Sequence, residues 1–193
     1  MQLKLDEVVL VPAGRPPHRD LSGSTFPTAD QRLSLTRLAA LGQPGLSVAS
    51  IEVDRGGTSY TVDTLAELTE SRPDAQLTLI IGTDQAVAFG NWREPVSIGA
   101  LAEIAVAARS GHDIDAARAA VTAATGRPTG SFEMPQIDIS STMIRERIAR
   151  GDQRRVGLQI VQDPLGAVED RVDLVRILLG DPEGANVVDL SLN

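Results

Sequence analysis

The residues with the clearest chemical potential lie at the start of one expected helix, in the stretch IDISSTMIRERIARG at residues 137–151. Ser140, Ser141 and Thr142 are residue types that cap helices well, and Arg145 follows within about one turn. A helix N-terminus presents backbone N–H groups without partners inside the helix, so it favours an anion such as a phosphate. The stretch therefore predicts a phosphate-binding helix start. An ordinary capped surface helix is the alternative.

A second group of candidates lies in the proline-rich loop PAGRPPHR at residues 12–19. His18 and Arg19 offer an imidazole and a guanidinium, and the guanidinium can hold a phosphate through two N–H groups. The two prolines before them fix the backbone φ angle and exclude helix. The pattern fits a phosphate contact, and a proline-rich surface turn is the alternative.

Three further stretches carry one candidate each. GTDQ at residues 82–85 offers backbone N–H groups and Asp84, whose carboxylate can accept hydrogen bonds from ribose hydroxyls. A helix N-cap is the alternative. Trp92, the single tryptophan, suits stacking on a flat ring or anchoring the edge of a core. SYT at residues 59–61 suits the start of a helix that its hydroxyls cap, unless its backbone N–H groups bind a carboxylate.

The elements that must position these residues alternate along the chain. Apolar runs predict strands, and apolar residues at helical spacing predict helices, as with Leu35, Leu38 and Ala39. We expect strands at residues 7–11, 46–53, 76–82 and 103–108 and just before 139, and helices at 28–41, 62–72, 97–102 and 115–124. Such alternation predicts an α/β fold with a doubly wound, mostly parallel sheet covered by helices on both faces. Ligands bind at the carboxyl ends of the strands in such folds, where the candidate loops fall.

The composition and net charge of the chain exclude some classes of function. A chain of 193 residues with 42% hydrophobic residues favours one globular domain, and a net charge of −8 argues against a nucleic-acid partner. No apolar run is long enough to span a membrane, and there is no cysteine, so cytoplasm is the expected location. We expect one domain over residues 1–151 and a divergent tail over 152–193, in which VVDLSL at residues 187–192 forms a short strand or a frayed end.

Taken in order, four stretches resemble bacterial nicotinate-nucleotide adenylyltransferases over residues 5–151: LDEVVLVPAGRPPHR, IEVDRGGTSYTVDTL, LIIGTDQAVAFGNWREP and DISSTMIRERIARG. The resemblance implies a Rossmann-like nucleotidylyltransferase fold. It also implies adenylyl transfer from ATP, with Mg²⁺, to nicotinate mononucleotide, giving nicotinate adenine dinucleotide and pyrophosphate in NAD biosynthesis.

The resemblance also implies roles for individual residues. The ATP-binding residues would be Gly82 and Asp84 at the adenosine ribose, Arg109 near the ATP, and Ser141, Thr142 and Arg145 at the phosphates. The mononucleotide-binding residues would be His18 and Arg19 at the phosphate, Trp92 on the nicotinate ring and Thr61 at its carboxylate.

The chain departs from the family pattern at its start. It has no GGTFDP-like turn and no His-x-Gly-His, since its two histidines lie in unrelated segments. The resemblance then implies a fold missing its first strand and helix, an unfilled slot beside residues 7–11, and a severe loss of activity. A catalytically inactive protein that binds nucleotide or mononucleotide, and a non-functional fragment, are the alternatives.

Overall fold

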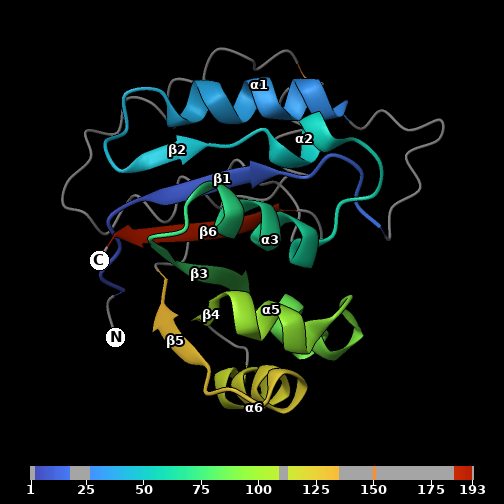
Figure 1. Cartoon of the computed structure of the whole chain (residues 1–193), viewed down its shortest axis with the longest axis vertical. Helices are drawn as coiled ribbons and strands as arrows, with labels where there is room; N and C mark the ends of the chain where they lie inside the picture. The colour runs from blue at the N-terminus through green and yellow to red at the C-terminus, as the bar shows by residue number, and fades with distance from the viewer. Residues whose placement is uncertain (1–2, 18–26, 109–112, 135–149, 151–184, 193) are drawn as a thin grey trace.

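The structure is a computed structural model that describes residues 3–17, 27–108, 113–134 and 150, and the backbone of residues 185–192. Its core is a sheet flanked by helices (Figure 1). Within the described part, no helix is both long enough and apolar enough to cross a membrane.

The sheet has six strands in the order β2-β1-β6-β3-β4-β5. Their bounds are β1 Val8–Pro12, β2 Leu46–Val48, β3 Ala75–Gly82, β4 Glu103–Ala108, β5 Gly130–Glu133 and β6 Ala185–Leu192. β1 pairs with β2 in parallel, and β3, β4 and β5 form a parallel set. β6 is antiparallel to both β1 and β3, so those two strands run in the same direction. The predicted mostly parallel sheet is confirmed.

β6 corrects one expectation about the sheet. Residues 7–11 were expected beside an unfilled slot, but β6 lies between β1 and β3 and pairs with both (Figure 1). Val188, near its middle, is in register with Val9 on one side and Leu79 on the other. The backbone groups on the inner edge of β1 are therefore covered, by a strand from the far end of the sequence. A strand or frayed end was predicted for that segment.

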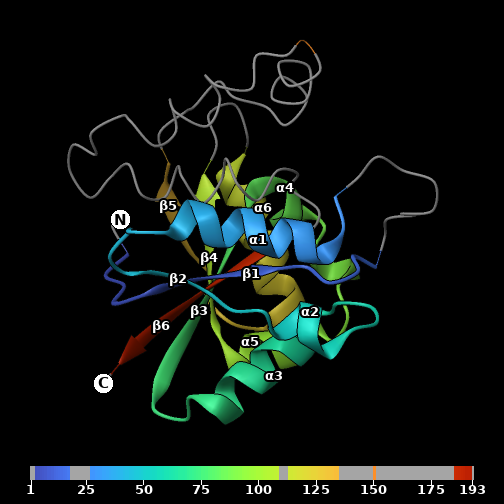
Figure 2. The same ribbon diagram turned by 90° about the horizontal axis from the view of Figure 1, so that it is seen from above.

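The helices follow the predicted alternation closely. Their bounds are α1 Ala29–Ala40, α2 Ile51–Arg55, α3 Thr61–Ser71, α4 Thr83–Val87, the 3₁₀ turn η1 Phe89–Asn91, α5 Pro95–Leu101 and α6 Ile114–Thr125. α1 begins at a capping box in which Thr28 accepts from the Gln31 backbone and the Gln31 side chain accepts from the Thr28 backbone. Figure 2 shows α2, α3 and α5 gathered on one side of the strands and α1 toward the other.

One local prediction is wrong, and the apolar residues that indicated α1 are not all on its buried face. The strand expected over residues 46–53 ends at Val48, and the segment IEVDR that follows forms α2. Alternating side chains in this short run resemble a strand, but Glu52 is buried by contacts that only the folded chain supplies. In α1, Leu35 and Leu38 are exposed, because the face toward the sheet is formed by other residues: Leu33, Thr36 and Ala40.

Alternate residues of the central strands pack into cores on opposite faces of the sheet. The larger core joins odd-numbered residues of β1 and β3 to α3, α5 and α6; its largest members include Val9, Val11, Leu77, Leu79, Ile81, Val106, Leu65, Leu68, Phe89, Ile98 and Val121. On the other face, Leu10 and Ile80 belong to a smaller cluster. This packing fixes the strand ends that carry the candidate loops.

Candidate active site

The candidate site lies at the edge of the sheet where the parallel strands end. Because β1, β3 and β4 run in one direction, their last residues, Pro12, Gly82 and Ala108, lie at the same edge. The loop after β1 and the start of α4 both begin there. The sequence-based prediction that these loops share one edge is thereby confirmed for the described strand ends.

The loop after β1 is held by a serine and an arginine from distant segments. Ser59 Oγ accepts the backbone N–H of Gly14 at 2.9 Å and that of Arg15 at 3.3 Å. The backbone N–H of Ser59 in turn donates to the Arg15 carbonyl at 2.9 Å. From α1, Arg32 donates to the carbonyl oxygens of Gly14, at 2.9 Å, and Ala13. The backbone of this loop is thus fixed before the chain reaches residue 18.

This arrangement changes the expected role of the SYT stretch. Its hydroxyls were expected to cap the following helix, but the N-cap of α3 is Tyr60, which makes no side-chain capping bond. Ser59 instead binds the loop after β1, and Thr61 is the first residue of α3. Thr61 is partly exposed there, and its predicted contact with a carboxylate stays a prediction.

Glu52, on α2, is buried next to the loop after β1 and α3, with 2% of its surface exposed. Its Oε1 accepts the hydroxyl of Thr64 on α3 at 2.8 Å. Burial raises the pKa of Glu52, and hydrogen bonds from Thr64 and Ser59 and the charge of Arg55 oppose that rise. Sequence reasoning missed this residue, because its pattern indicated a strand and its partners are separated from it in the chain.

Arg93 connects the start of α3 to the segment that carries Trp92. Its guanidinium carbon lies 4.6 Å from the centre of the Tyr60 ring, a cation–π contact, and its Nη1 lies 3.7 Å from the Asp63 carboxylate. Tyr60 and Asp63 flank Thr61 in the sequence. The structure therefore brings together the neighbourhoods of two predicted mononucleotide-binding residues, and Arg93 was not among the predictions.

Trp92 itself is partly buried. Its ring centre is 4.8 Å from that of Phe89, with the rings tilted by 33°, and it packs against the main core. This is the arrangement expected of a tryptophan that anchors the edge of a core. The ring is not fully covered, so the predicted stacking on a flat ligand stays a prediction.

The loop after β3 contains Gly82 and Asp84. Gly82 is the N-cap of α4 and makes no side-chain capping bond, and Asp84 lies in the first turn. Between them, Thr83 is 1% exposed, and its hydroxyl has no hydrogen-bond partner in the structure as described. Such a buried, unpaired hydroxyl is uncommon and marks this strand end as unusual.

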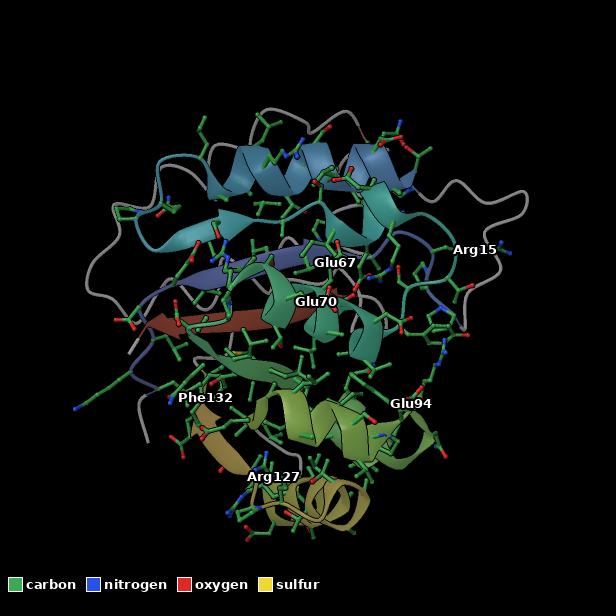
Figure 3. All side chains as sticks on the ribbon, in the orientation of Figure 1. Arg15, Glu67, Glu70, Glu94, Arg127 and Phe132 are labelled. Atoms are coloured by element: carbon green, nitrogen blue, oxygen red, sulfur yellow. The ribbon has the colours of Figure 1, made fainter. Side chains whose placement is uncertain are left out.

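The other predicted site residues lie outside the described residues: His18, Arg19, Arg109, Ser141, Thr142 and Arg145. One cation of the same proline-rich loop is described, namely Arg15, which is exposed and which sequence reasoning did not select. Figure 3 shows Arg15 and Glu94 on the same side of the molecule, toward which β1 points. A third basic residue in PAGRPPHR was the signal available for Arg15.

Comparison with known proteins gives the family. Residues 1–147 match the family described as cytidylyltransferase-like, about three quarters of the chain. The chain is 40% identical over 168 residues to a probable nicotinate-nucleotide adenylyltransferase of Marinobacter nauticus, covering 79% of this chain and 76% of the relative. For the protein of the same name in Streptomyces coelicolor the identity is 39% over 157 residues, covering 78% and 77%. The chain belongs to the cytidylyltransferase-like family, among relatives named nicotinate-nucleotide adenylyltransferase.

Family membership agrees with the geometry of the sheet. The match to the cytidylyltransferase-like family covers β1 to β5, which are all parallel, and ends at residue 147, before the antiparallel β6. A third relative, from Leifsonia xyli subsp. xyli, is 37% identical over 147 residues, covering 76% of this chain and 69% of its own length. The predicted fold class and enzyme family are thus confirmed.

Proposed function

We propose that this chain is a nicotinate-nucleotide adenylyltransferase, which transfers the adenylyl group of ATP to nicotinate mononucleotide. A phosphate oxygen of the mononucleotide attacks the α-phosphorus of ATP and forms a new P–O bond. The bond between the α-phosphorus and the bridging oxygen breaks, and pyrophosphate leaves. The observation that carries the proposal is the family match, with relatives named for this activity over about three quarters of the chain.

The described geometry supports this reaction, because the reaction mainly requires the protein to align its two substrates. Phosphoryl-type transfer depends on holding two substrates in line and neutralising their charge, and it needs no protein nucleophile. The ends of β1, β3 and β4 meet at one edge, so a mononucleotide at one loop and ATP at another would lie side by side.

On the mononucleotide side, we propose that Trp92 stacks on the nicotinate ring and that Thr61 and its backbone N–H bind the carboxylate. Arg93 supports this pair, because it contacts residues on both sides of Thr61 and follows Trp92 directly. His18 and Arg19 would bind the mononucleotide phosphate, and the exposed Arg15 lies in the same loop.

On the ATP side, we propose that Gly82 and Asp84 bind the adenosine ribose. Their place at the end of β3, in the first turn of α4, supports this assignment. Arg109, Ser141, Thr142 and Arg145 would bind the ATP itself, the last three at its phosphates. This half of the proposal rests on family resemblance for all but the first two residues.

Mg²⁺ fits this site as an ion carried by ATP. Among the described residues there is no group of three or more Asp, Glu or His side chains that would hold a metal ion. Magnesium in nucleotide-dependent enzymes is commonly bound by substrate phosphates with few protein ligands, so the donor set is compatible. The ion would neutralise phosphate charge when bound, and the protein's part is to orient the phosphates.

A cytoplasmic location remains a prediction.

We propose that residues 1–193 on their own transfer the adenylyl group slowly. The sequence holds two histidines and no His-x-Gly-His, the pattern that the family resemblance associates with charge stabilisation on the phosphates. Losing one preorganised donor to a developing charge costs roughly 10²-fold to 10³-fold in rate. Trp92 and the loop after β1 are nevertheless present, so we expect the chain to bind the mononucleotide even though its turnover is slow.

The test is pyrophosphate release from ATP and Mg²⁺ with nicotinate mononucleotide, compared with nicotinamide mononucleotide under identical conditions. We expect slow release that favours the nicotinate substrate. Binding of nicotinate mononucleotide, seen as a change in Trp92 fluorescence, without pyrophosphate release would favour an inactive binding protein. Folded protein that neither binds the mononucleotide nor releases pyrophosphate would contradict the proposal.

A further inference from the structure

Among the described residues, Glu52 is the buried ionisable group that the proposed reaction leaves unused. It lies on α2, which carries none of the predicted site residues, and only 2% of its surface is exposed. Burying a carboxyl group is unfavourable unless hydrogen bonds satisfy it. Its partners therefore indicate what its burial achieves.

The hydrogen bond between Ser59 and Glu52 has a defined direction. Ser59 Oγ accepts two backbone N–H groups, from Gly14 and Arg15, which occupies both of its lone pairs. The Ser59 hydroxyl hydrogen is then left to donate, and a hydrogen bond from Ser59 is among the causes that oppose the rise in the pKa of Glu52. Glu52 thus orients the hydroxyl whose oxygen fixes the loop after β1.

A second hydrogen bond reaches the other side of the site. Thr64 donates to Glu52 Oε1 at 2.8 Å, and the Thr64 oxygen accepts from Arg55 at 3.0 Å. Thr64 is three residues after Thr61, so it lies on the same side of α3, one turn on. One carboxyl group is therefore hydrogen-bonded to Ser59, whose oxygen holds the loop after β1, and to Thr64 in the first turns of α3.

We propose that Glu52 is a positioning residue that sets the loop after β1 at a fixed separation from the start of α3, and thereby shapes the mononucleotide side of the site. This inference rests on the proposed function for the identity of the ligand. The ATP side begins at the end of β3, and none of the contacts of Glu52 given above reach it.

Replacing Glu52 by glutamine provides a sharp test, because the shape is kept while one acceptor oxygen becomes an NH₂ donor. That group would face the hydroxyl hydrogen of Ser59 or that of Thr64, both of which donate to this carboxyl group. The matched control is Glu67→Gln, an identical chemical change at an exposed carboxylate that pairs with Arg55 at 3.2 Å.

The first measurement is equilibrium binding to the full chain, followed by the fluorescence of Trp92, its single tryptophan. For E52Q we expect the Kd for nicotinate mononucleotide to rise about tenfold, comparable to losing one hydrogen bond to a charged group, and the Kd for ATP to change less than about twofold. E67Q should leave both constants unchanged. Equal weakening of both ligands in E52Q would show a general structural role and overturn the proposal.

The second measurement is amide hydrogen exchange, which needs no ligand and separates this inference from the proposed function. The amides of Gly14, Arg15 and Ser59 should exchange faster in E52Q, while those of β4 keep their wild-type rates. If the wild-type chain binds no nicotinate mononucleotide, the proposed function fails, and this exchange pattern alone decides the role of Glu52. Unchanged exchange at the three amides would overturn it. If E52Q does not fold, Ser59→Ala removes the same contact and is judged by the Gly14 and Arg15 amides and by the same split in affinity.

Discussion

Gly14 lies so close to the backbone of Glu52 that a Cβ atom on Gly14 would be 2.3 Å from the Glu52 carbonyl oxygen. Real Cβ atoms essentially never approach backbone so closely, so the loop after β1 and α2 touch without room for any side chain. We expect Gly14→Ala to lower the free energy of unfolding by about 1 to 3 kcal/mol, the usual cost of overpacking. Urea unfolding measures this.

The control for Gly14→Ala is Gly90→Ala, since a Cβ there would have no atom within 4 Å. The control should change stability by less than about 0.5 kcal/mol, as surface substitutions usually do. Equal stability of the two variants would show that the loop after β1 is not packed against α2. Nicotinate mononucleotide binding to Gly14→Ala should weaken as well, because the displaced loop carries Arg15 and leads to residues 18–19.

Arg93 holds the start of α3 to the segment that carries Trp92, through the Tyr60 ring and the Asp63 carboxylate. Its side chain is half exposed, so Arg93→Ala should cost less than about 1 kcal/mol of stability. The Kd for nicotinate mononucleotide should rise about threefold to fivefold, the value of one exposed cation–π contact. Trp92 fluorescence titration measures this Kd.

The matched control for Arg93→Ala is Arg37→Ala, at an exposed arginine on α1. It removes the same charge from the chain, so it corrects for the general electrostatic effect on an anionic ligand. Equal weakening by the two variants would indicate that Arg93 acts through net charge and not through its contacts with Tyr60 and Asp63.

Much of this fold could be predicted because its signals are local. β3 and β4 are mainly apolar runs bounded by turn residues, and α1 is capped by Thr28 with a glutamine three residues on. Alternation of strands and helices then indicates a parallel sheet, whose strand ends must share one edge. The position of Gly82 and Asp84 at that edge follows from this reasoning alone.

The remaining features depend on contacts between distant segments, which periodicity does not report. Ser59 and Gly14 are 45 residues apart, so the hydroxyl that sequence assigns to a helix cap binds a loop instead. Glu52 was expected in a strand because a short alternating run fits either structure. β6 pairs with β1 although most of the sequence separates them. The apolar pattern of β6 alone does not distinguish a central strand from a frayed end.

β6 joins the two halves of the sheet, since β1 and β3 each pair with it and not with each other. Proline at Val188 removes a backbone N–H in the middle of a central strand. We expect Val188→Pro to lower the free energy of unfolding by more than about 2 kcal/mol, from a lost bond and an unpaired partner. Ala185→Pro is the control, because proline is tolerated at the first residue of a strand. Equal unfolding midpoints for the two variants would mean that β6 does not hold the halves together.

Burial raises the pKa of Glu52 above its ordinary value of 4.5, against the hydrogen bonds from Thr64 and Ser59 and the charge of Arg55. Between 4.5 and the raised pKa, the folded chain binds more protons at this residue than the unfolded chain does. The contribution of Glu52 to stability is therefore complete below about pH 4.5 and is lost as the pH rises through the folded pKa. The stability of the wild type minus that of E52Q should fall with pH across this window, in urea unfolding at stepped pH. A difference that grows with pH would reverse the assigned direction.

Thr83 provides the last prediction, because its hydroxyl is buried at the end of β3 and has no hydrogen-bond partner in the described structure. Thr83→Val keeps the shape and removes an unsatisfied polar group, so it should raise the free energy of unfolding, by up to about 1 kcal/mol. Thr83→Ser, which keeps the hydroxyl and loses a methyl group, is the control and should be destabilising. Both are measured by urea unfolding without and with ATP. A Thr83→Val variant that loses stability without ligand would show that the hydroxyl has a partner. A gain without ligand that disappears with ATP would instead place this hydroxyl at the nucleotide, beside Gly82 and Asp84.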